Sequence, residues 1–442
     1  MLPSSKVKKK VLLVGAGHCA SLVIENVKSR RLNYEIIGLV DDNPKLKNTK
    51  IDGSPILGAI KDIPTLAKKY GPDEILIAMP SVVGEPLRKI VNICKQTDKP
   101  IKIIPAVIDM VRYVDEQLLP PEEKKKKVNI VAGKLREINY LDFIKRSPPD
   151  LDIESIKKVV SQSVVLVTGA VGSIGKAVSK ELVRLHPKKL ILVDINESEM
   201  FNLALVFPHD QVEFIIGDIR DKGKMERVFK ENKPDVVIHA AAYKHVPVME
   251  KNPDEAIKTN IFGTRNILDL SDKYNVKRFV LISTDKAVNP IGVMGMTKRI
   301  CEFMVTHFPK DKTAYSVVRF GNVMGSNGSL FTIWEKQIKT GKLDVTHPEM
   351  TRYFMSIQEA AMLILETLTM QNESMFIFDM GKPLKIVDLA KLFIEHHGYE
   401  TGKEVKLNFI GIREGEKLHE GLSHDDEELL QTKNVRIYAI KP

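Results

Sequence analysis

The stretch Val164-Val-Leu-Val-Thr-Gly-Ala-Val-Gly-Ser-Ile-Gly175 decides the fold. Its apolar start is typical of a buried strand, and its three glycines precede a helical pattern that begins at about residue 176. This is the turn that holds a pyrophosphate at a helix N-terminus. The next predicted strand, 189–193, is followed by Asp194, 19 residues after Gly175. Because the acid that binds an adenosine ribose stands about 20 residues beyond the turn, the stretch predicts a Rossmann-like dinucleotide site.

Further strands are expected at 213–216, 236–239 and 278–282, each followed by small or polar residues. Asp218 follows the first of them, where it suits an adenine amino group, although Gly-Asp is also a good turn. Alanines after His239 leave room for the ribose and nicotinamide of a cofactor, with a plain core strand end as the alternative. The residues predicted to bind the dinucleotide are Gly169, Gly172, Ser173, Ile174, Gly175, Asp194, Asp218, Ile219, Ala240, Ala241, Ala242 and Lys298.

The same order of elements occurs nearer the N-terminus. A strand pattern at 11–14 leads into Gly15-Ala-Gly17-His-Cys-Ala20, a helical stretch, a strand at 36–40 and Asp41-Asp42, with further strands at 74–78 and 101–104. Residues 1–138 therefore predict a first Rossmann-like domain. Because no later motif there supplies catalytic groups, we expect an accessory or regulatory role, with a second nucleotide or coenzyme site as the alternative.

The overall prediction is an α/β chain with two tandem doubly wound parallel sheets. Residues 139–160, which contain Arg146-Ser-Pro-Pro-Asp150, are expected to be a connector, and 161–442 the catalytic domain. After about Thr313 the strand–helix alternation loosens. A smaller C-terminal lobe that binds the substrate is expected there, at the carboxyl edge of the second sheet.

The composition limits the class of protein. Of the 442 residues 43% are hydrophobic and 28% charged, as in soluble globular proteins, and no apolar run is long enough for a membrane helix. The net charge is +10, but the basic residues are spread along the chain, so phosphate-bearing small molecules are favoured over nucleic acid. Cys19, Cys94 and Cys301 lack metal-type spacing, so neither a disulfide nor a metal site is expected.

A candidate catalytic centre lies at Ser283-Thr-Asp-Lys286, followed by Met294-x-x-x-Lys298. This is the layout of a dehydrogenase centre in which methionine replaces the usual tyrosine. The alternative is an ordinary strand-end turn followed by one turn of an ordinary helix. The dinucleotide pattern upstream favours the catalytic interpretation.

Together these motifs carry a resemblance to a known family. They are Thr168-Gly-x-x-Gly172-x-x-Gly175, His239-Ala-Ala-Ala-Tyr-Lys-His-Val-Pro247, Ser283-Thr-Asp-Lys-Ala-Val-Asn-Pro290, Arg319-Phe-Gly-Asn-Val323 and Arg352-Tyr-Phe-Met355. The chain resembles the polysaccharide-biosynthesis branch of the extended short-chain dehydrogenases, and within it the bacterial UDP-N-acetylglucosamine 4,6-dehydratases. The resemblance implies bound NAD rather than NADP, a UDP-N-acetylglucosamine substrate, a homo-oligomer and a role in surface polysaccharide or glycoprotein sugar synthesis.

Many long relatives carry membrane helices ahead of the first domain, and this sequence shows none. We therefore expect a cytoplasmic protein, or else a truncated form of a longer one. Peripheral association with a membrane is a further expectation of the resemblance.

The resemblance also implies roles for the catalytic residues Thr284, Asp285, Lys286, Met294 and Lys298. Lys286 would take the sugar carbon 5 proton if its pKa is depressed, and Asp285 would protonate the departing carbon 6 hydroxyl if its pKa is raised. Lys298 would hold the nicotinamide ribose. Because Met294 cannot accept a proton, the base for the carbon 4 hydroxyl stays open between Thr284, Asp285 and water. The configuration at carbon 5 is also open, with retention favoured.

Substrate contacts are expected from residues after the later strands and near the C-terminus. These are Lys244, His245, Asn322, Arg352, Arg413 and Glu416. A guanidinium suits a diphosphate, although a surface salt bridge is the alternative for each arginine. The competing functions are a UDP-hexose 4-epimerase, a dehydratase of another nucleotide sugar and a non-catalytic nucleotide-binding sensor. Met294 argues against the first, and the Asp285, Lys286 and Lys298 set argues against the last.

Overall fold

A computed structural model gives the structure of residues 8–441, apart from 30–31, 105–135, 138–148, 208–209, 310–311, 327 and 371–373. The chain divides into two compact units, Met1–Pro148 and Pro149–Pro442. This boundary lies inside the segment 139–160 that the sequence predicts as a connector. The part of that segment before Pro149, residues 139–148 with Arg146, lies outside the described residues.

The first unit is built on a doubly wound sheet with strand order β3-β4-β2-β1-β5-β6-β7. Its parallel strands are β1 (Lys9–Val14), β2 (Tyr34–Val40), β4 (Ser54–Gly58), β5 (Glu74–Ile77) and β6 (Ile101–Ile103). The short strands β3 (Lys50–Ile51) and β7 (Arg136–Glu137) pair antiparallel at the edges. Helices α1 (His18–Lys28), α2 (Ile63–Tyr70) and α3 (Gly84–Lys95) complete the described part. The predicted α/β class is confirmed for this unit.

The second unit contains a larger sheet with strand order β10-β9-β8-β11-β12-β13-β18-β22-β21. The parallel strands are β8 (Val164–Thr168), β9 (Lys189–Asp194), β10 (Val212–Ile216), β11 (Val236–His239), β12 (Arg278–Ile282), β13 (Ala314–Arg319) and β18 (Met375–Phe378). The order reverses between β8 and β11, which is where a doubly wound sheet binds its ligand. Strands β21 (Leu429–Gln431) and β22 (Ile437–Ile440) continue it antiparallel.

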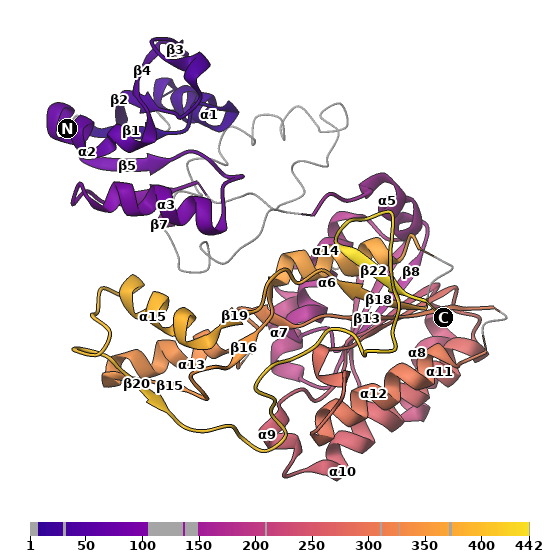
Figure 1. Ribbon diagram of the computed structural model, residues 1–442. Coiled ribbons are helices and arrows are strands. Elements are labelled where there is room, and N and C mark those ends of the chain that lie inside the picture. Colours follow the sequence, from indigo (N-terminus) through magenta and orange to yellow (C-terminus); the bar gives the residue numbers. More distant parts are fainter. Residues whose placement is uncertain are drawn as a thin grey trace, which may run out of the picture. The chain divides into compact units, whose positions relative to one another are not determined.

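Helices pack against both faces of this sheet (Figure 1). One group comprises α5 (Ile153–Ser161), α6 (Ser173–Arg184) and α14 (Ile357–Thr367), and the other α8 (Lys222–Asn232), α11 (Thr264–Lys273) and α12 (Val293–Thr306). Because both faces are covered, the central strands are continuously apolar: Val165, Leu166 and Val167 have no exposed surface. Helix α5 comes from the predicted connector but packs on α14, so it is part of the second unit.

A smaller lobe is formed by segments between β13 and the C-terminus, and contains the orange to golden-yellow elements α13, β15, α15 and β20 of Figure 1. It contains the strand pairs β14 (Asn322–Met324) with β17 (Phe354–Ser356), β15 (Lys342–Val345) with β20 (Lys406–Phe409), and β16 (Thr351–Arg352) with β19 (Leu384–Lys385). Its helices are α13 (Leu330–Gln337) and α15 (Ile386–His396). Trp334, fully buried beside Phe331 and Phe393, is the centre of this lobe.

Within the described residues, none of the helices has the length and apolar character needed to cross a bilayer. In the same part of the chain no cluster of side chains could hold a metal ion, and Cys19, Cys94 and Cys301 are unpaired thiols.

Candidate active site

A cavity of about 570 Å³ lies at the carboxyl ends of β8, β11, β12 and β13 in the second unit. Most of the predicted site residues line it: Gly169, Gly172, Ser173, Ile174, Gly175, Ala240, Ala242, Lys244, His245, Thr284, Lys286, Met294, Lys298, Asn322, Arg352, Arg413 and Glu416. Five predicted residues are not among its lining: Asp194, Asp218, Ile219, Ala241 and Asp285. The cavity therefore joins the predicted cofactor turn, the Thr-Asp-Lys segment and the C-terminal lobe.

The glycine turn between β8 and α6 has room for a ligand and none for extra side chains. Gly169 has φ +67°, and a Cβ there would lie 2.6 Å from the backbone nitrogen of Ala241. A Cβ on Gly175 would lie 2.1 Å from the carbonyl oxygen of Gly169. These contacts bring α6 close to β8 and leave the first turn of α6 facing the cavity, as a pyrophosphate site requires.

Asp194 ends β9 and braces this turn. Its Oδ2 accepts a hydrogen bond of 3.1 Å from the backbone nitrogen of Val171, and its Oδ1 accepts one of 3.0 Å from that of Asn196. The carboxylate is thereby fixed beside the turn in the position predicted for the ribose-binding acid. The glycine turn, this carboxylate and Lys298 fit an adenine dinucleotide.

Asp218 does not have a free carboxylate. Its Oδ2 accepts a hydrogen bond of 2.7 Å from Arg220, which also pairs with Glu255 at 2.8 Å. Burial raises the pKa of Asp218, but the hydrogen bonds from Arg220 outweigh it, so the pKa is lowered. The neighbouring Ile219 is buried in the core, where its side chain lies against Gly263.

Lys298 lies on α12 one turn after Met294, and both are buried while lining the cavity. The Lys298 ammonium donates a hydrogen bond of 2.5 Å to the carbonyl oxygen of Ile282, and burial lowers its pKa. Met294 packs with Val246, Met249 and Ala256. Methionine at this position is thus both a core side chain and part of the cavity wall.

Lys286 is the centre of the candidate catalytic group. Its Nζ lies 3.1 Å from Asp285 Oδ1, 3.0 Å from Asn322 Oδ1 and 3.0 Å from Glu420 Oε1. Burial lowers its pKa, but the charges of Asp285 and Glu420 outweigh burial, so the pKa is raised. A second carboxyl group, that of Glu420, faces the ammonium and thus opposes the depressed pKa that the role of Lys286 as a base requires.

Asp285 has no exposed surface. Burial raises its pKa, but Lys286 and hydrogen bonds from neighbouring groups outweigh burial and lower it. Lys286 thus opposes the raised pKa that the role of Asp285 as an acid requires. Asp285 begins the 3-10 turn 285–287, and its buried carboxylate accepts a hydrogen bond from Lys286 Nζ.

Glu420 is a candidate site residue that the sequence analysis does not predict. It lines the cavity, its side chain is 2% exposed, and it pairs with Lys286 and with Arg352 Nε at 3.1 Å. Burial, aided by the ionised Asp285 and opposed by the charges of Lys286 and Arg352, raises its pKa to about 7. It stands seven residues after Arg413 and four after Glu416, two residues that the sequence predicts as substrate contacts.

Two predicted phosphate ligands have protein partners in this structure. Arg352 Nε forms an ion pair with Glu420. Its Nη1 donates hydrogen bonds to the carbonyl oxygens of Thr351 and Leu418, and its Nη2 donates one to the carbonyl oxygen of Lys417. Arg413 forms a two-bond pair with Glu416, at 3.1 and 2.5 Å. Arg352 thus holds the segment 413–427, which we call the C-terminal arm, while the half-exposed Arg413 stays at the cavity surface.

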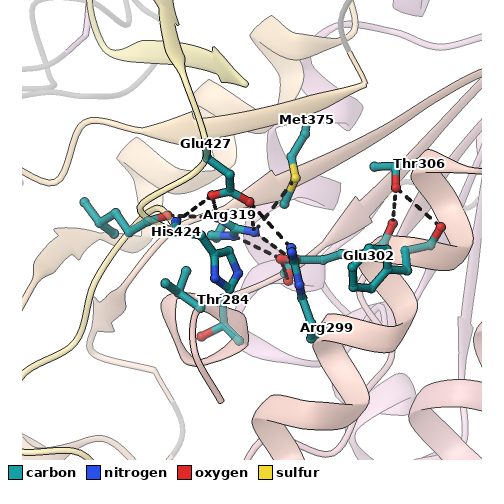
Figure 2. Close-up of polar contacts among 12 residues, drawn as sticks. Thr284, Arg299, Glu302, Thr306, Arg319, Met375, His424 and Glu427 are labelled. Atoms are coloured by element: carbon teal, nitrogen blue, oxygen red, sulfur yellow. Dashed lines mark hydrogen bonds and ion pairs between the residues drawn. The ribbon is translucent and has the colours of Figure 1, made fainter. Parts of the chain in front are cut away.

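A buried ion cluster fixes the other end of the C-terminal arm (Figure 2). Arg319 Nη2 lies 2.8 Å from Glu302 Oε2, and its Nη1 lies 2.6 Å from Glu427 Oε2. Arg299 bridges the same two carboxylates. We call these four residues the Arg319 cluster. Ser283, just before the Thr-Asp-Lys segment, donates a hydrogen bond of 2.6 Å to Glu302, so the cluster joins that segment to the arm.

The first unit repeats one feature of the nucleotide turn. Asp41 follows β2, and its Oδ2 accepts a hydrogen bond of 2.7 Å from the backbone nitrogen of Ala16, between Gly15 and Gly17. Its Oδ1 accepts one of 2.8 Å from Asn43. This is the pattern that Asp194 makes with Val171 and Asn196 in the second unit. The first unit thus keeps the acid that braces a glycine turn.

Comparison with known proteins agrees with this division. Residues 165–442 match a family described as polysaccharide biosynthesis protein, and residues 3–105 match a CoA-binding domain. The capsular polysaccharide biosynthesis protein CapD of Staphylococcus aureus is 38% identical over 98% of this chain and 72% of its own length.

Two further relatives each match about three fifths of the chain. A UDP-N-acetylglucosamine 4,6-dehydratase (inverting) of Campylobacter jejuni is 35% identical over 63% of this chain and 82% of its own length. A UDP-glucose 4-epimerase of Rickettsia bellii is 35% identical over 60% of this chain and 78% of its own length. The family match extends over the whole second unit from β8 onward, with the cavity and the Thr-Asp-Lys segment inside it. The chain therefore belongs to the polysaccharide biosynthesis protein family of extended short-chain dehydrogenases.

Proposed function

We propose that the chain is an NAD-dependent 4,6-dehydratase of UDP-N-acetylglucosamine. The observation that carries the proposal is the arrangement of Lys286 between two carboxyl groups at the cavity wall, beside a helix position that holds Met294 in place of an acid–base residue. A dehydratase must move protons at carbons 5 and 6 of the sugar, which calls for additional acid–base groups. A 4-epimerase needs chiefly an acid–base group at carbon 4.

The chain is 35% identical both to a dehydratase and to an epimerase, so sequence identity does not distinguish the two reactions and the residues of the site must do so. The thioether of Met294 cannot exchange a proton with the carbon 4 hydroxyl. Lys286 and Glu420, in contrast, are titratable groups that line the cavity. This supports dehydration over epimerisation.

When bound, the nicotinamide would supply a hydride acceptor and donor. Residues of this chain suited to hold the dinucleotide are the glycine turn 169–175, Asp194 and Lys298, whose ammonium is fixed on the Ile282 carbonyl oxygen. Asp194 favours NAD over NADP, because a carboxylate repels a 2′-phosphate and accepts hydrogen bonds from ribose hydroxyls.

Lys286 is proposed to receive the carbon 5 proton. Its ammonium form donates to three acceptors and has no lone pair. Before it can accept the carbon 5 proton, the ammonium must therefore pass a proton to one of the carboxyl groups that it contacts. Proton transfer along a hydrogen bond of about this length gives a neutral amine and a carboxylic acid without changing the net charge of the site. Asn322 then keeps the amine oriented.

Lys244 and His245 are proposed to contact the sugar or diphosphate. Both line the cavity, and burial is the main cause that lowers the pKa of each. Repulsion from Lys286 lowers the pKa of Lys244 further, and repulsion from Lys244 lowers that of His245 further. An anionic ligand would offset this repulsion, so the pair suits a diphosphate-bearing substrate. Arg413 is a further candidate if its Glu416 partner is displaced.

A panel of nucleotide sugars tests the proposed reaction. The purified chain with NAD is incubated with UDP-N-acetylglucosamine, UDP-glucose, UDP-galactose or dTDP-glucose, and the products are separated and weighed by mass spectrometry. We expect UDP-N-acetylglucosamine to yield a product lighter by one water. An isomer of unchanged mass from a UDP-hexose would instead identify an epimerase, and a silent panel would favour a non-catalytic sensor.

Asp194→Ala is expected to weaken NAD binding about ten- to hundredfold, because hydrogen bonds from the ribose to a carboxylate are lost. Isothermal titration of NAD measures the change. Asp194→Asn keeps an oxygen acceptor for the Val171 nitrogen, so it separates the effect on ribose from that on the turn. Unchanged affinity in both variants would mean that the ribose is held elsewhere.

A further inference from the structure

The buried carboxyl groups of Asp285 and Glu420 share a feature that neither motif nor family match predicts. Within the described residues, Asp285 Oδ2 and Glu420 Oε2 are both buried without a hydrogen-bond partner if each group is ionised. The two carboxyl groups are nevertheless within hydrogen-bonding reach of each other. One proton between them would satisfy both oxygens, and two bare carboxylates would repel each other.

The surroundings decide which residue keeps that proton. Asp285 is flanked by Lys286 Nζ at 3.1 Å and by the Thr284 hydroxyl, which donates a hydrogen bond of 2.8 Å to Oδ1. Glu420 is faced by Lys286 from the Thr-Asp-Lys segment, Arg352 from β16, Asp285, and Lys417 from its own arm. Asp285 is the group with a lowered pKa, and Glu420 the group whose pKa is raised to about 7, so the proton belongs to Glu420.

Access to the cavity separates the two carboxyl groups as well. Glu420 lines the cavity, whereas Asp285 has no exposed surface and is not part of the lining. A Cβ on Gly321 would lie 3.1 Å from Asp285 Oδ2, so the backbone of Gly321 covers that oxygen. An acid must reach the oxygen that it protonates, and only Glu420 of this pair faces the space where a sugar fits.

We propose that Glu420 is the general acid that protonates the departing carbon 6 hydroxyl, while Asp285 stays ionised and keeps the proton on Glu420. This assignment rests on the proposed dehydratase function. It replaces Asp285 by Glu420 in the acid role and gives the C-terminal arm a direct part in the reaction.

The elimination then balances within the site. Neutral Lys286 takes the proton from carbon 5, and the electron pair of that bond forms the carbon 5–carbon 6 double bond. The carbon 6–oxygen bond breaks, and the oxygen leaves as water with the proton of Glu420. The step ends with Lys286 as ammonium and Glu420 as carboxylate, 3.0 Å apart, and transfer of one proton from Lys286 to Glu420 restores both.

Glu420→Gln tests the acid role, because it should slow the loss of water without stopping the exchange of the carbon 5 hydrogen with solvent. The variant and the wild type are incubated with UDP-N-acetylglucosamine and NAD in heavy water. We expect loss of water to slow about 10²- to 10⁴-fold in the variant, while Lys286 still exchanges the carbon 5 hydrogen for deuterium in recovered sugar. Equal loss of exchange and elimination would show a merely structural role, and full elimination activity would overturn the proposal.

Two variants serve as controls for the comparison of water loss with carbon 5 exchange. Glu420→Asp keeps a titratable group and is expected to recover part of the elimination rate. Glu226→Gln makes the same change in a glutamate paired with Lys273 at the surface of α8, and wild-type rates are expected. A Glu420→Asp rate no higher than that of Glu420→Gln would contradict a role for the carboxylic acid.

The pH dependence gives a second prediction with a definite sign. The active arrangement, neutral Lys286 with protonated Glu420, holds one proton fewer than the ammonium–acid pair that is present below the pKa of Glu420, so the elimination rate of the wild type should rise as pH rises through about 7. Asp285→Asn removes a like charge that raises the pKa of Glu420, so this rise should move to lower pH. In Glu420→Gln the rise near pH 7 should disappear. Identical profiles in all three proteins would refute the assignment.

A measurement without substrate separates this proposal from the proposed function. Infrared difference spectra between acidic and alkaline buffer detect the carbonyl band of a protonated carboxylic acid in the free protein. We expect a band that titrates near pH 7 in the wild type and is absent from Glu420→Gln. If the band persists in the variant, the proton is not on Glu420. If the band behaves as expected but no nucleotide sugar reacts, the dehydratase proposal fails and the protonated pair stands.

Discussion

Lys286→Ala is expected to reduce product formation from UDP-N-acetylglucosamine by about 10²- to 10⁴-fold, the usual contribution of a positioned acid–base group. The ammonium is the common partner of Asp285, Asn322 and Glu420, so alanine removes the proposed base and leaves two facing carboxyl groups without their cation. The measurement is the initial rate of keto-sugar formation with saturating substrate.

The affinity for NAD should change little in the same variant, since the residues proposed to hold the dinucleotide are Gly169–Gly175, Asp194 and Lys298. Lys222→Ala is a matched control, because Lys222 is half-exposed at the start of α8 and pairs only with Asp269 at 3.3 Å among the described ion pairs. A near-normal rate for Lys286→Ala, with the control also normal, would remove Lys286 from the mechanism.

Arg319→Met is expected to lower the free energy of unfolding of the second unit by about 3 to 5 kcal/mol, because it leaves Glu302 and Glu427 as buried charges with one cation between them. Arg319 has no exposed side-chain surface, so water cannot replace its hydrogen bonds. Urea denaturation followed by the fluorescence of Trp334 measures the change.

Arg265→Met serves as the control for this effect. Arg265 pairs with Asp269 on the surface of α11 and is 58% exposed, so its ion pair contributes at most about 1 kcal/mol. Equal losses in the two variants would contradict the view that the Arg319 cluster is a buried structural joint. Arg319 Nη1 also donates to the carbonyl oxygen of Leu422, two residues from Glu420. If Arg319→Met loses elimination activity at urea concentrations at which it is still folded, the cluster positions the arm.

The strands of both sheets follow directly from local sequence. Runs such as 164–167 and 279–282 are apolar throughout, and a strand covered on both faces requires that pattern. The start of α6 was predicted at about residue 176, and the helix begins at Ser173. The difference arises because Gly175, counted as part of the turn, lies in the first turn of the helix. Glycine permits the close contact with Gly169 there.

The candidate site was predictable where its residues lie in a strand-end motif. The glycine turn and the segment around Lys286 are local patterns, and the fold brings them together because the carboxyl ends of parallel strands meet at one edge. Glu420 follows no strand of that sheet. Its contact with Lys286 depends on the C-terminal arm, which Arg352 and the Arg319 cluster hold in place. A pKa that depends on such a contact cannot be deduced from neighbours in the sequence.

The central claim, that this chain removes water from a nucleotide sugar, is tested most directly in heavy water. The wild-type protein is incubated with UDP-N-acetylglucosamine and catalytic NAD, and the sugar is followed by proton NMR and mass spectrometry. The account predicts a 4-keto-6-deoxy product with solvent deuterium at carbon 5, formed without net consumption of NAD. A sugar that keeps its carbon 6 hydroxyl, whether unchanged or inverted at carbon 4, would contradict it.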